Sequence, residues 1–180
     1  MKQKSGLYPQ EPQWRANKLT RYLNIPVVTA SWLTEQGSIT QRLRQQFGDG
    51  IAVTVLKNEW QRSFLSEAFL LKSAIYRYAL IREVVLSIDK QPLVLARTVI
   101  PFDTVVATQQ NLSQLGSRPL GELIFSDPHL QRRAVEIAYI EAKEWHSDFS
   151  EAGAWGRRTV YIMHKQPLLV SEFFLPAVLD

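Results

Sequence analysis

One carboxylate and three arginines lie within strongly apolar stretches of the chain, and they are the residues best suited to chemistry. Glu172 is in the middle of the run LLVSEFFL at 168–175, where an isolated ionised carboxylate is costly unless it is paired or hydrogen-bonded. Arg82, Arg97 and Arg157 leave a surplus of positive charge that a small anionic ligand would neutralise. An ordinary Arg–Glu pair, with the other arginines reaching solvent, explains the same residues equally well.

Two β-hairpins of similar sequence are the elements that must position these side chains. Residues 90–101 align without gaps on residues 165–176, at an offset of 165 − 90 = 75. The match indicates either an internal repeat or a coincidence between two short segments.

The register of each hairpin decides which side chains share a face of the sheet. A two-residue loop at 90–91 makes Arg82 and Arg97 diagonal neighbours on one face. The equivalent register in the second hairpin brings Arg157 and Glu172 onto the counterpart face. A slip of one residue would reverse every facing.

Length and composition predict one globular domain over residues 1–180, with residues 1–25 as a partly ordered N-terminal arm. Hydrophobic residues make up 46% and charged residues 21% of the chain, values that are ordinary for a soluble domain. The N-terminal sequence has no apolar core of signal-peptide length, and no apolar run reaches the roughly 18 residues of a membrane span. We therefore expect a cytoplasmic protein, monomeric and without stable membrane insertion.

Several classes of function are disfavoured by what the sequence lacks. The chain has no cysteine, which excludes disulfides, thiol catalysis and cysteine-ligated metals. His129, His146 and His164 have no metal-ligand spacing, and phosphate-loop, dinucleotide and serine-hydrolase motifs are absent. The net charge of +4 mildly favours anionic partners, but the arginines are dispersed and no nucleic-acid motif occurs. We expect no metal, no cofactor and no nucleic-acid partner.

Two helix starts offer backbone N–H groups that can hold an anion. One is near Ile39, where Ser38 and Gln41 form a capping-box pattern. The other is near Leu120, in a helix expected within 112–125 with Ser117 as N-cap. Caps of this kind occur in any helix, so the two starts carry little weight alone.

The other segments are assigned from pattern and breakers. We expect a short helix over 29–35, a helix from Ser38 to Phe47 that ends at Gly48, and a strand over 51–57. Residues 59–73 are expected to form a flap or loop, and 130–149 a charged helix.

Five segments in this order resemble the chorismate lyase family. They are LIRE at 80–83, ARTVIP at 96–101, LGSRPLG at 115–121, AGAWGRR at 152–158 and PLLVSEFFLP at 167–176. The resemblance extends over about residues 30–177. Residues 139–151 look like an insertion, Ala96 stands where the family often has glycine, and Ile39 replaces a methionine.

The resemblance implies an α+β fold, in which helices pack on an antiparallel sheet and helical flaps close an internal ligand pocket. It implies cofactor-free elimination of pyruvate from chorismate to give 4-hydroxybenzoate, the first step of ubiquinone biosynthesis. By similarity, Arg82 and the backbone N–H groups of Ile39 and Leu120 hold the ring carboxylate. Glu172 hydrogen-bonds the ring hydroxyl.

A mechanism follows as a hypothesis. Aromatisation drives the elimination, so the protein need only orient the substrate, exclude water and stabilise the departing oxygen. We expect Arg97, together with Arg157, to meet the enolpyruvyl carboxylate and the leaving oxygen. Glu172 orients the hydroxyl or takes the neighbouring ring proton as a base.

Two alternatives remain open at this point. The UTRA effector-sensing domains of GntR-type regulators look similar in fold and bind small ligands without turnover. They normally follow a DNA-binding segment, for which the roughly 25 residues before the matched region are too few. A related lyase that acts on a chorismate analogue is the other alternative.

Overall fold

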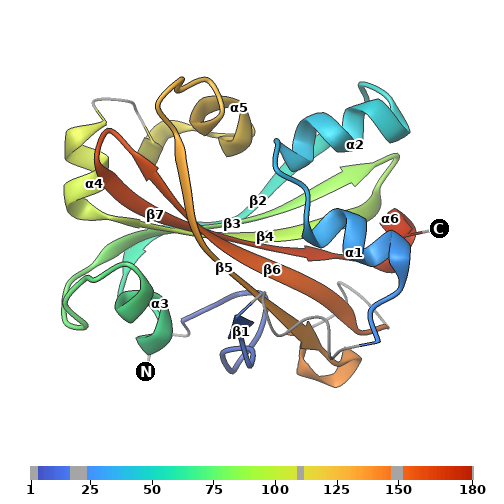
Figure 1. Ribbon diagram of the computed structural model, residues 1–180, viewed down its shortest axis with the longest axis horizontal. Coiled ribbons are helices and arrows are strands. Elements are labelled where there is room, and N and C mark those ends of the chain that lie inside the picture. Colours follow the sequence, from blue (N-terminus) through green and yellow to red (C-terminus); the bar gives the residue numbers. More distant parts are fainter. Residues whose placement is uncertain (1–3, 17–23, 109–111, 147–151, 180) are drawn as a thin grey trace.

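The computed structural model describes residues 4–16, 24–108, 112–146 and 152–179. Its centre is a seven-stranded antiparallel sheet in the order β1-β5-β6-β7-β4-β3-β2, with helices packed on it (Figure 1). The strands are β1 (Arg15–Ala16), β2 (Ala52–Gln61), β3 (Ala79–Ile88), β4 (Gln91–Pro101), β5 (Gln131–Ile140), β6 (Ala154–Met163) and β7 (Gln166–Phe174). The helices are α1 (Val27–Leu33), α2 (Ile39–Phe47), α3 (Leu65–Leu70), α4 (Phe102–Ala107), α5 (Leu120–Ile124) and α6 (Pro176–Leu179), with 3-10 turns η2 (Leu112–Gln114) and η3 (Ala142–Glu144). The predicted α+β class with an antiparallel sheet is confirmed.

Both predicted hairpins are present, as β3–β4 and β6–β7. Each turns through two residues with positive φ, at 89–90 and at 164–165. Two consecutive residues of this kind match the right-handed twist of the flanking strands. Both turns lie one residue earlier than the sequence pattern suggested.

The predicted register of the first hairpin is wrong by one residue. Arg97 pairs with Glu83 and Arg82 pairs with Thr98, so the two arginines point to opposite faces of the sheet. The cause is the earlier turn together with a register shift next to Leu86, where β4 contains one extra residue.

In the second hairpin the predicted facing is confirmed, although the pairing differs. Arg157 lies directly opposite Glu172, two residues away from the assumed partner. A shift of two residues leaves every side chain on its original face. The sheet thus carries Arg82, Arg157 and Glu172 on one face, called here the site face, and Arg97 on the other, called the back face.

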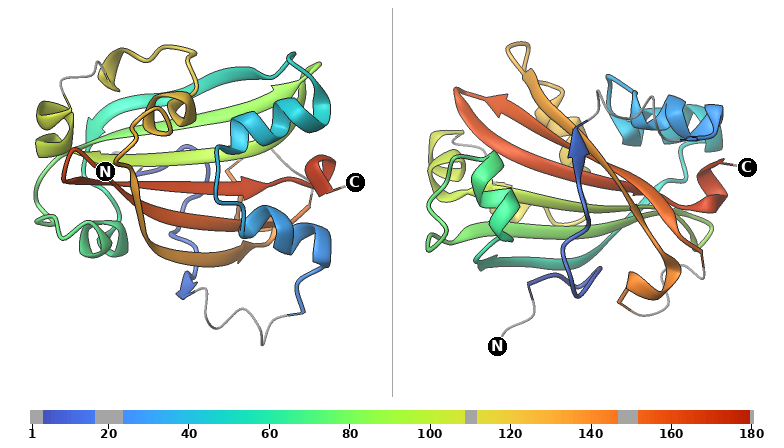
Figure 2. Two further views of the ribbon diagram at one scale, coloured as in Figure 1. Left: turned by 45° about the horizontal axis from the view of Figure 1, so that its top comes forward. Right: turned by 60° about the horizontal axis from the view of Figure 1, so that its bottom comes forward.

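The site face is covered by helices at both of its ends. Trp32, Leu33 and Leu43 of α1 and α2 pack on Val84 and Phe174. The opposite end is covered by η2, α5 and the residues between them, in a separate apolar cluster. Between these covers lies the middle of the face, where the polar side chains are. Figure 2 shows α1 and α2 at one end of the sheet, and α3 and α4 at the other.

The N-terminal segment packs against the back face more extensively than the sequence indicated. Ser5, Leu7 and Tyr8 are buried, and β1 adds a short strand to the edge at β5. Residues 1–3 and 17–23 of the predicted arm lie outside the described residues.

One predicted helix is wrong, and the predicted start of another is corrected. The charged segment after residue 130 forms β5, in which Val135, Ile137 and Tyr139 alternate toward the site face. Its Arg, Glu and Ala residues favour helices, but pairing with β6 overrides that local preference. In the second case, α5 begins at Leu120 with Pro119 as N-cap, two residues later than expected. Residues 147–151 of the presumed insertion lie outside the described part.

Candidate active site

The pair formed by Arg157 and Glu172 is at the centre of the site face. Arg157 Nε donates to Glu172 Oε2 at 2.8 Å, and the arginine side chain is 1% exposed. Burial opposes the charge of Arg157, but the surrounding groups, the carboxylate of Glu172 foremost among them, together outweigh this effect and raise the pKa of the guanidinium. The Nε contact therefore holds the Glu172 side chain in a fixed orientation.

Arg82 is a buried cation that the described residues leave without a carboxylate partner. Its Nη2 donates to the carbonyl oxygens of Gly116, at 2.8 Å, and Arg118, at 3.1 Å. Its Nη1 is buried and has no hydrogen-bond partner, and burial lowers the pKa of the guanidinium. A buried guanidinium nitrogen without an acceptor is unfavourable, so this position suits an anionic ligand.

The two predicted helix starts meet above the sheet. Ser38 caps α2 by accepting from the N–H of Gln41 at 3.3 Å. A Cβ built on Gly121, in the first turn of α5, would lie 2.9 Å from Ser38 Oγ, so the two helix starts are in close contact. The first N–H groups of the two helices, on Ile39 and Leu120, thus come from adjoining turns. Because the carbonyls that anchor Arg82 lie just before α5, this arginine belongs to the same assembly.

A small residue separates the two ends of the site. Ala96 lies between Val84 and Glu172 in one row of cross-strand neighbours. Arg82 lies two residues before Val84 on β3, in the next row on the same face. With about 4.8 Å between strands and about 3.4 Å per residue, the Cα atoms of Arg82 and Glu172 are about 12 Å apart.

Arg132 is a further cation that the sequence did not single out. It lies opposite Tyr161 on the site face, and its Nη1 donates to the Glu35 carbonyl at 3.0 Å and to Gln36 Oε1 at 2.7 Å. Its Nε is buried without a partner, and burial lowers its pKa. Because the segment was predicted as a helix, no facing could be assigned to Arg132; a strand assignment would have revealed it.

Arg157 holds the same piece of chain as Arg132. Its Nη1 donates to the carbonyl oxygens of Trp32, at 3.4 Å, and Glu35. Residues 32–36, called here the 32–36 flap, comprise the end of α1 and the first part of its connection to α2. Two arginines thus attach this segment to two adjacent strands. This attachment positions the helix start at Ile39.

Packing on the back face helps to fix this geometry. A Cβ on Gly156, next to Arg157, would lie 2.3 Å from the Phe173 ring. Only glycine leaves room for the Phe173 ring to lie over β6 at this point, directly beside the Arg157–Glu172 pair in the ladder.

Arg97 is not part of this assembly, so its predicted position beside Arg82 is corrected. On the back face it contacts Glu67 through Nε, at 2.8 Å, and Nη2, at 3.0 Å, and Glu83 through Nη1, at 2.7 Å. Its side chain is 0% exposed. The two carboxylates satisfy the guanidinium, and we no longer assign it to the substrate.

Two features are absent among the described residues. No group of three or more His, Asp or Glu side chains there is arranged to hold a metal ion. None of the described helices has the length and apolar character needed to cross a membrane.

Known proteins are similar to this chain over most of its length. A family model described as chorismate lyase matches residues 9–180. A protein of Methylococcus capsulatus named "Probable chorismate pyruvate-lyase" is 42% identical over 155 residues, which cover 83% of this chain and 96% of the relative. A protein of Halorhodospira halophila with the same name is 34% identical over 183 residues, covering 98% of this chain and 96% of the relative.

Among solved structures, the effector domain of PhnF from Mycobacterium smegmatis has a similar fold. Its TM-score is 0.55 at 14% identity, and the match covers 79% of this chain and 91% of that domain. At this level of identity the likeness concerns the fold alone.

Proposed function

The chain belongs to the chorismate lyase family, and we propose that it is a chorismate pyruvate-lyase, a carbon–oxygen lyase. The reaction breaks the bond between the ring and the enolpyruvyl oxygen and removes the proton from the ring carbon that bears the hydroxyl. The ring becomes 4-hydroxybenzoate, and the enolpyruvate takes up a proton to become pyruvate. The observation that carries the proposal is Arg82 Nη1, which is buried without a hydrogen-bond partner among the described residues and lies on the same face as Glu172.

The ring carboxylate is assigned to Arg82 and the two helix starts. Arg82 Nη1 supplies a charged donor, and the N–H groups of Ile39 and Leu120 add two neutral ones. Hydrogen bonds between a guanidinium and a carboxylate are roughly twice as strong as neutral ones, which suits a site that must extract an anion from water. The carbonyls of Gly116 and Arg118 keep the guanidinium in place for this contact.

The ring hydroxyl is assigned to Glu172. Arg157 occupies Oε2 of this carboxylate, which leaves Oε1 for the substrate. In this position Glu172 accepts a hydrogen bond from the ring hydroxyl, or acts as a general base that removes the proton from the ring carbon bearing this hydroxyl.

The second carboxylate of chorismate needs a different cation from the one first expected. Because Arg97 lies on the back face, we assign the enolpyruvyl carboxylate and the departing oxygen to Arg157 and Arg132. The buried Arg132 Nε, which has no partner among the described residues, supports this choice. Two guanidiniums beside the leaving oxygen would stabilise the charge that develops as its bond to the ring breaks.

The 32–36 flap is assigned to the exclusion of water. Both arginines that attach it also belong to the proposed site, so closing the flap and ordering the cations are a single event. A ring held by a carboxylate contact at one end and a hydroxyl contact at the other should then leave slowly. We expect 4-hydroxybenzoate to be a strong inhibitor.

Two alternatives are weaker than this proposal. Effector-domain function has only the fold in its favour, since the regulator structure is 14% identical. A lyase for a chorismate analogue would use the same contacts and is distinguished by assay. We further propose that the protein acts as a monomer in the cytoplasm, in the first step of ubiquinone biosynthesis.

The test is a cofactor-free assay. Purified protein is incubated with chorismate in the presence of EDTA, and 4-hydroxybenzoate and pyruvate are both quantified, with light scattering to give the mass in solution. We expect equimolar products, lost in Arg82→Ala and Glu172→Ala and retained in Arg133→Ala, an exposed arginine. Saturable binding of 4-hydroxybenzoate without turnover would instead indicate a sensor or another substrate.

A further inference from the structure

Helix α3 has its polar and apolar sides reversed relative to an ordinary surface helix. Its carboxylate Glu67 is buried against Arg97 at 2.8 Å. Its large apolar residues Leu65 and Phe69, one turn apart, are 54% and 69% exposed. A surface helix normally directs its apolar side inward, so the outward side of α3 is suited to an apolar environment.

Helix α4 is reversed in the same way. Thr104 is buried and donates to the Pro167 carbonyl at 2.6 Å. Phe102 and Val106, again one turn apart, are 55% and 58% exposed. Two short helices with the same reversal at the same end of the sheet indicate a common cause (Figure 1).

Helix α4 contacts both the end of β2 and the chain that connects α3 to β3. The rings of Trp60 and Phe102 are 5.8 Å apart, and Arg77 bridges to Asp103 at 2.9 Å. Of the thirteen large hydrophobic residues exposed in the described chain, eight belong here. We call this the α3–α4 surface: Trp60, Leu65, Phe69, Ile75, Tyr76, Tyr78, Phe102 and Val106.

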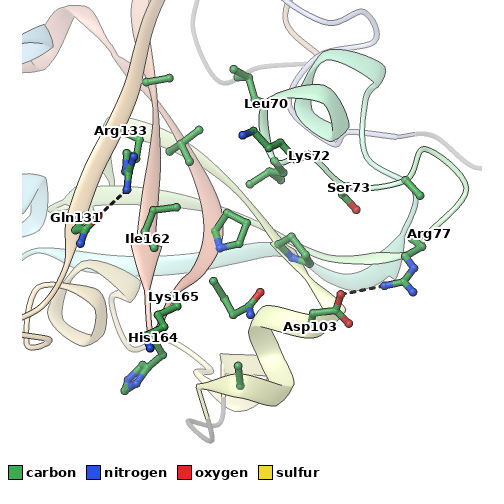
Figure 3. A pocket seen from close by; sticks show the side chains of 18 of the residues that line it. Leu70, Lys72, Ser73, Arg77, Asp103, Gln131, Arg133, Ile162, His164 and Lys165 are labelled. Atoms are coloured by element: carbon green, nitrogen blue, oxygen red, sulfur yellow. Dashed lines mark hydrogen bonds and ion pairs between the residues drawn. The ribbon is translucent and has the colours of Figure 1, made fainter.

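Cations line the adjoining hollow, which has a volume of about 1430 Å³ and lies away from the proposed active site (Figure 3). Lys72 and Arg77 of the connection between α3 and β3, Arg133 of β5 and Lys165 of the β6–β7 turn surround it. Its acidic residues are Asp103 and Asp127, and Arg77 engages the first of them. The charged groups therefore leave an excess of positive charge beside the apolar surface.

We propose that the α3–α4 surface docks this protein peripherally on an anionic phospholipid bilayer. Exposed aromatic and aliphatic side chains insert at the level of the lipid headgroups, where Tyr, Trp and Phe are favoured. The neighbouring cations pair with anionic headgroups. A protein partner would also cover apolar residues. The combination of separate exposed aromatic side chains with a cationic hollow is better matched by an anionic lipid bilayer. The active site, beneath other helices, stays unobstructed.

The test is vesicle co-sedimentation of the full chain at low and high salt. Vesicles of phosphatidylcholine alone are compared with vesicles that also contain phosphatidylglycerol. We expect binding to the mixed vesicles only, weakened by salt. Lys72→Gln with Lys165→Gln should weaken it about thirtyfold, since each basic residue near the surface contributes about a factor of five. Phe69→Ser with Phe102→Ser should weaken it as well.

The matched control is Val27→Ser with Val28→Ser, two exposed apolar residues at the far end of the sheet, which should bind like the wild type. Turnover measured without vesicles reports whether each variant is folded. Absence of binding to mixed vesicles, or binding unaffected by both pairs of substitutions, would overturn the proposal. So would a dimer that dissociates when Phe69 and Phe102 are replaced, because a second copy would then be the occupant.

Discussion

Arg157 and Glu172 face each other directly across β6 and β7 and share a 2.8 Å hydrogen bond. A second Arg–Glu pair, Arg158 and Glu136, lies on the back face between β6 and β5, with 2.7 Å between Arg158 Nε and Glu136 Oε2. The same kind of pair thus occurs on the two faces of one strand. Only the first lies within the proposed active site, so the second serves as an internal control for it.

Glu172→Gln should lower kcat by about 10²–10⁴ if the carboxylate acts as a base. The amide keeps the size of the side chain and can still hydrogen-bond the ring hydroxyl, so affinity for 4-hydroxybenzoate should change far less. Steady-state kinetics and product inhibition separate the two effects. Glu136→Gln disrupts the back-face pair and should leave kcat unchanged. A Glu172→Gln variant with full turnover would rule out the base.

Ala96→Leu should abolish turnover and product binding without unfolding the protein. Ala96 lies between Val84 and Glu172 in the floor of the site, and a branched side chain there would occupy the space assigned to the ring. A displacement of about 1 Å can cost about 10² in rate, and a filled site should cost at least as much. Calorimetry with 4-hydroxybenzoate gives the readout. Ala96→Gly is the control and should bind normally.

Arg132→Gln should weaken product inhibition by about tenfold or more. The change removes a charged donor to the Glu35 carbonyl and Gln36, and hydrogen bonds to charged groups contribute about 1.5–3 kcal/mol each. With the flap less firmly attached, stopped-flow measurement should show faster release of 4-hydroxybenzoate. Arg133→Gln, on the adjacent exposed residue, should behave like the wild type. An unchanged inhibition constant would contradict the assignment of Arg132.

Arg97→Met should destabilise the fold and leave the chemistry of the folded fraction intact. Removing the cation strands the buried carboxylates of Glu67 and Glu83, a change that lowers the free energy of unfolding by about 3–5 kcal/mol. Urea denaturation measures the loss. Arg77→Met breaks an exposed pair and should cost less than about 1 kcal/mol. Unchanged stability with lost turnover would return Arg97 to the catalytic site.

The buried phenol of Tyr161 should make the free energy of unfolding depend on pH under alkaline conditions. Burial raises its pKa to about 12, whereas an unfolded tyrosine ionises near 10. The unfolded state therefore loses its proton first, so this stabilising contribution is full below pH ~10 and lost as pH rises toward ~12. Tyr161→Phe should make the free energy of unfolding fall by about 2–3 kcal/mol less over this window. Denaturation at each pH gives the free energy of unfolding, and the same dependence on pH in the wild type and in Tyr161→Phe would contradict the shift.

The apolar runs, the caps and the family resemblance were enough to predict both hairpins, the antiparallel sheet and the convergence of two helix starts. They also placed Arg157 beside Glu172. These features depend on local patterns, such as strand alternation and the N-cap at Ser38, which the fold preserves.

The position of Arg97 could not be predicted, because it depends on a single extra residue in β4. Register is set by turn geometry and bulges, and the period of two makes one residue decisive. Arg132 was missed for a different reason: helix-favouring residues in β5 hid a strand that only pairing with β6 stabilises. Both errors arise from long-range pairing, for which the local sequence carries no signal.

The atoms by which the 32–36 flap meets the site come largely from its main chain. Arg157 takes the carbonyls of Trp32 and Glu35, Arg132 takes the second of these, and the proposed substrate contact of Ile39 is an N–H. Every amino acid carries a carbonyl, and every one except proline carries an N–H. Exposed side chains in the flap, such as that of Thr34, are therefore free to change during evolution while the contribution of the flap to the reaction persists. Trp32 and Leu33, which pack in the core, and the two arginines are not. Substitutions between relatives should accumulate at the exposed positions of the flap and spare the arginines of β5 and β6 that hold it.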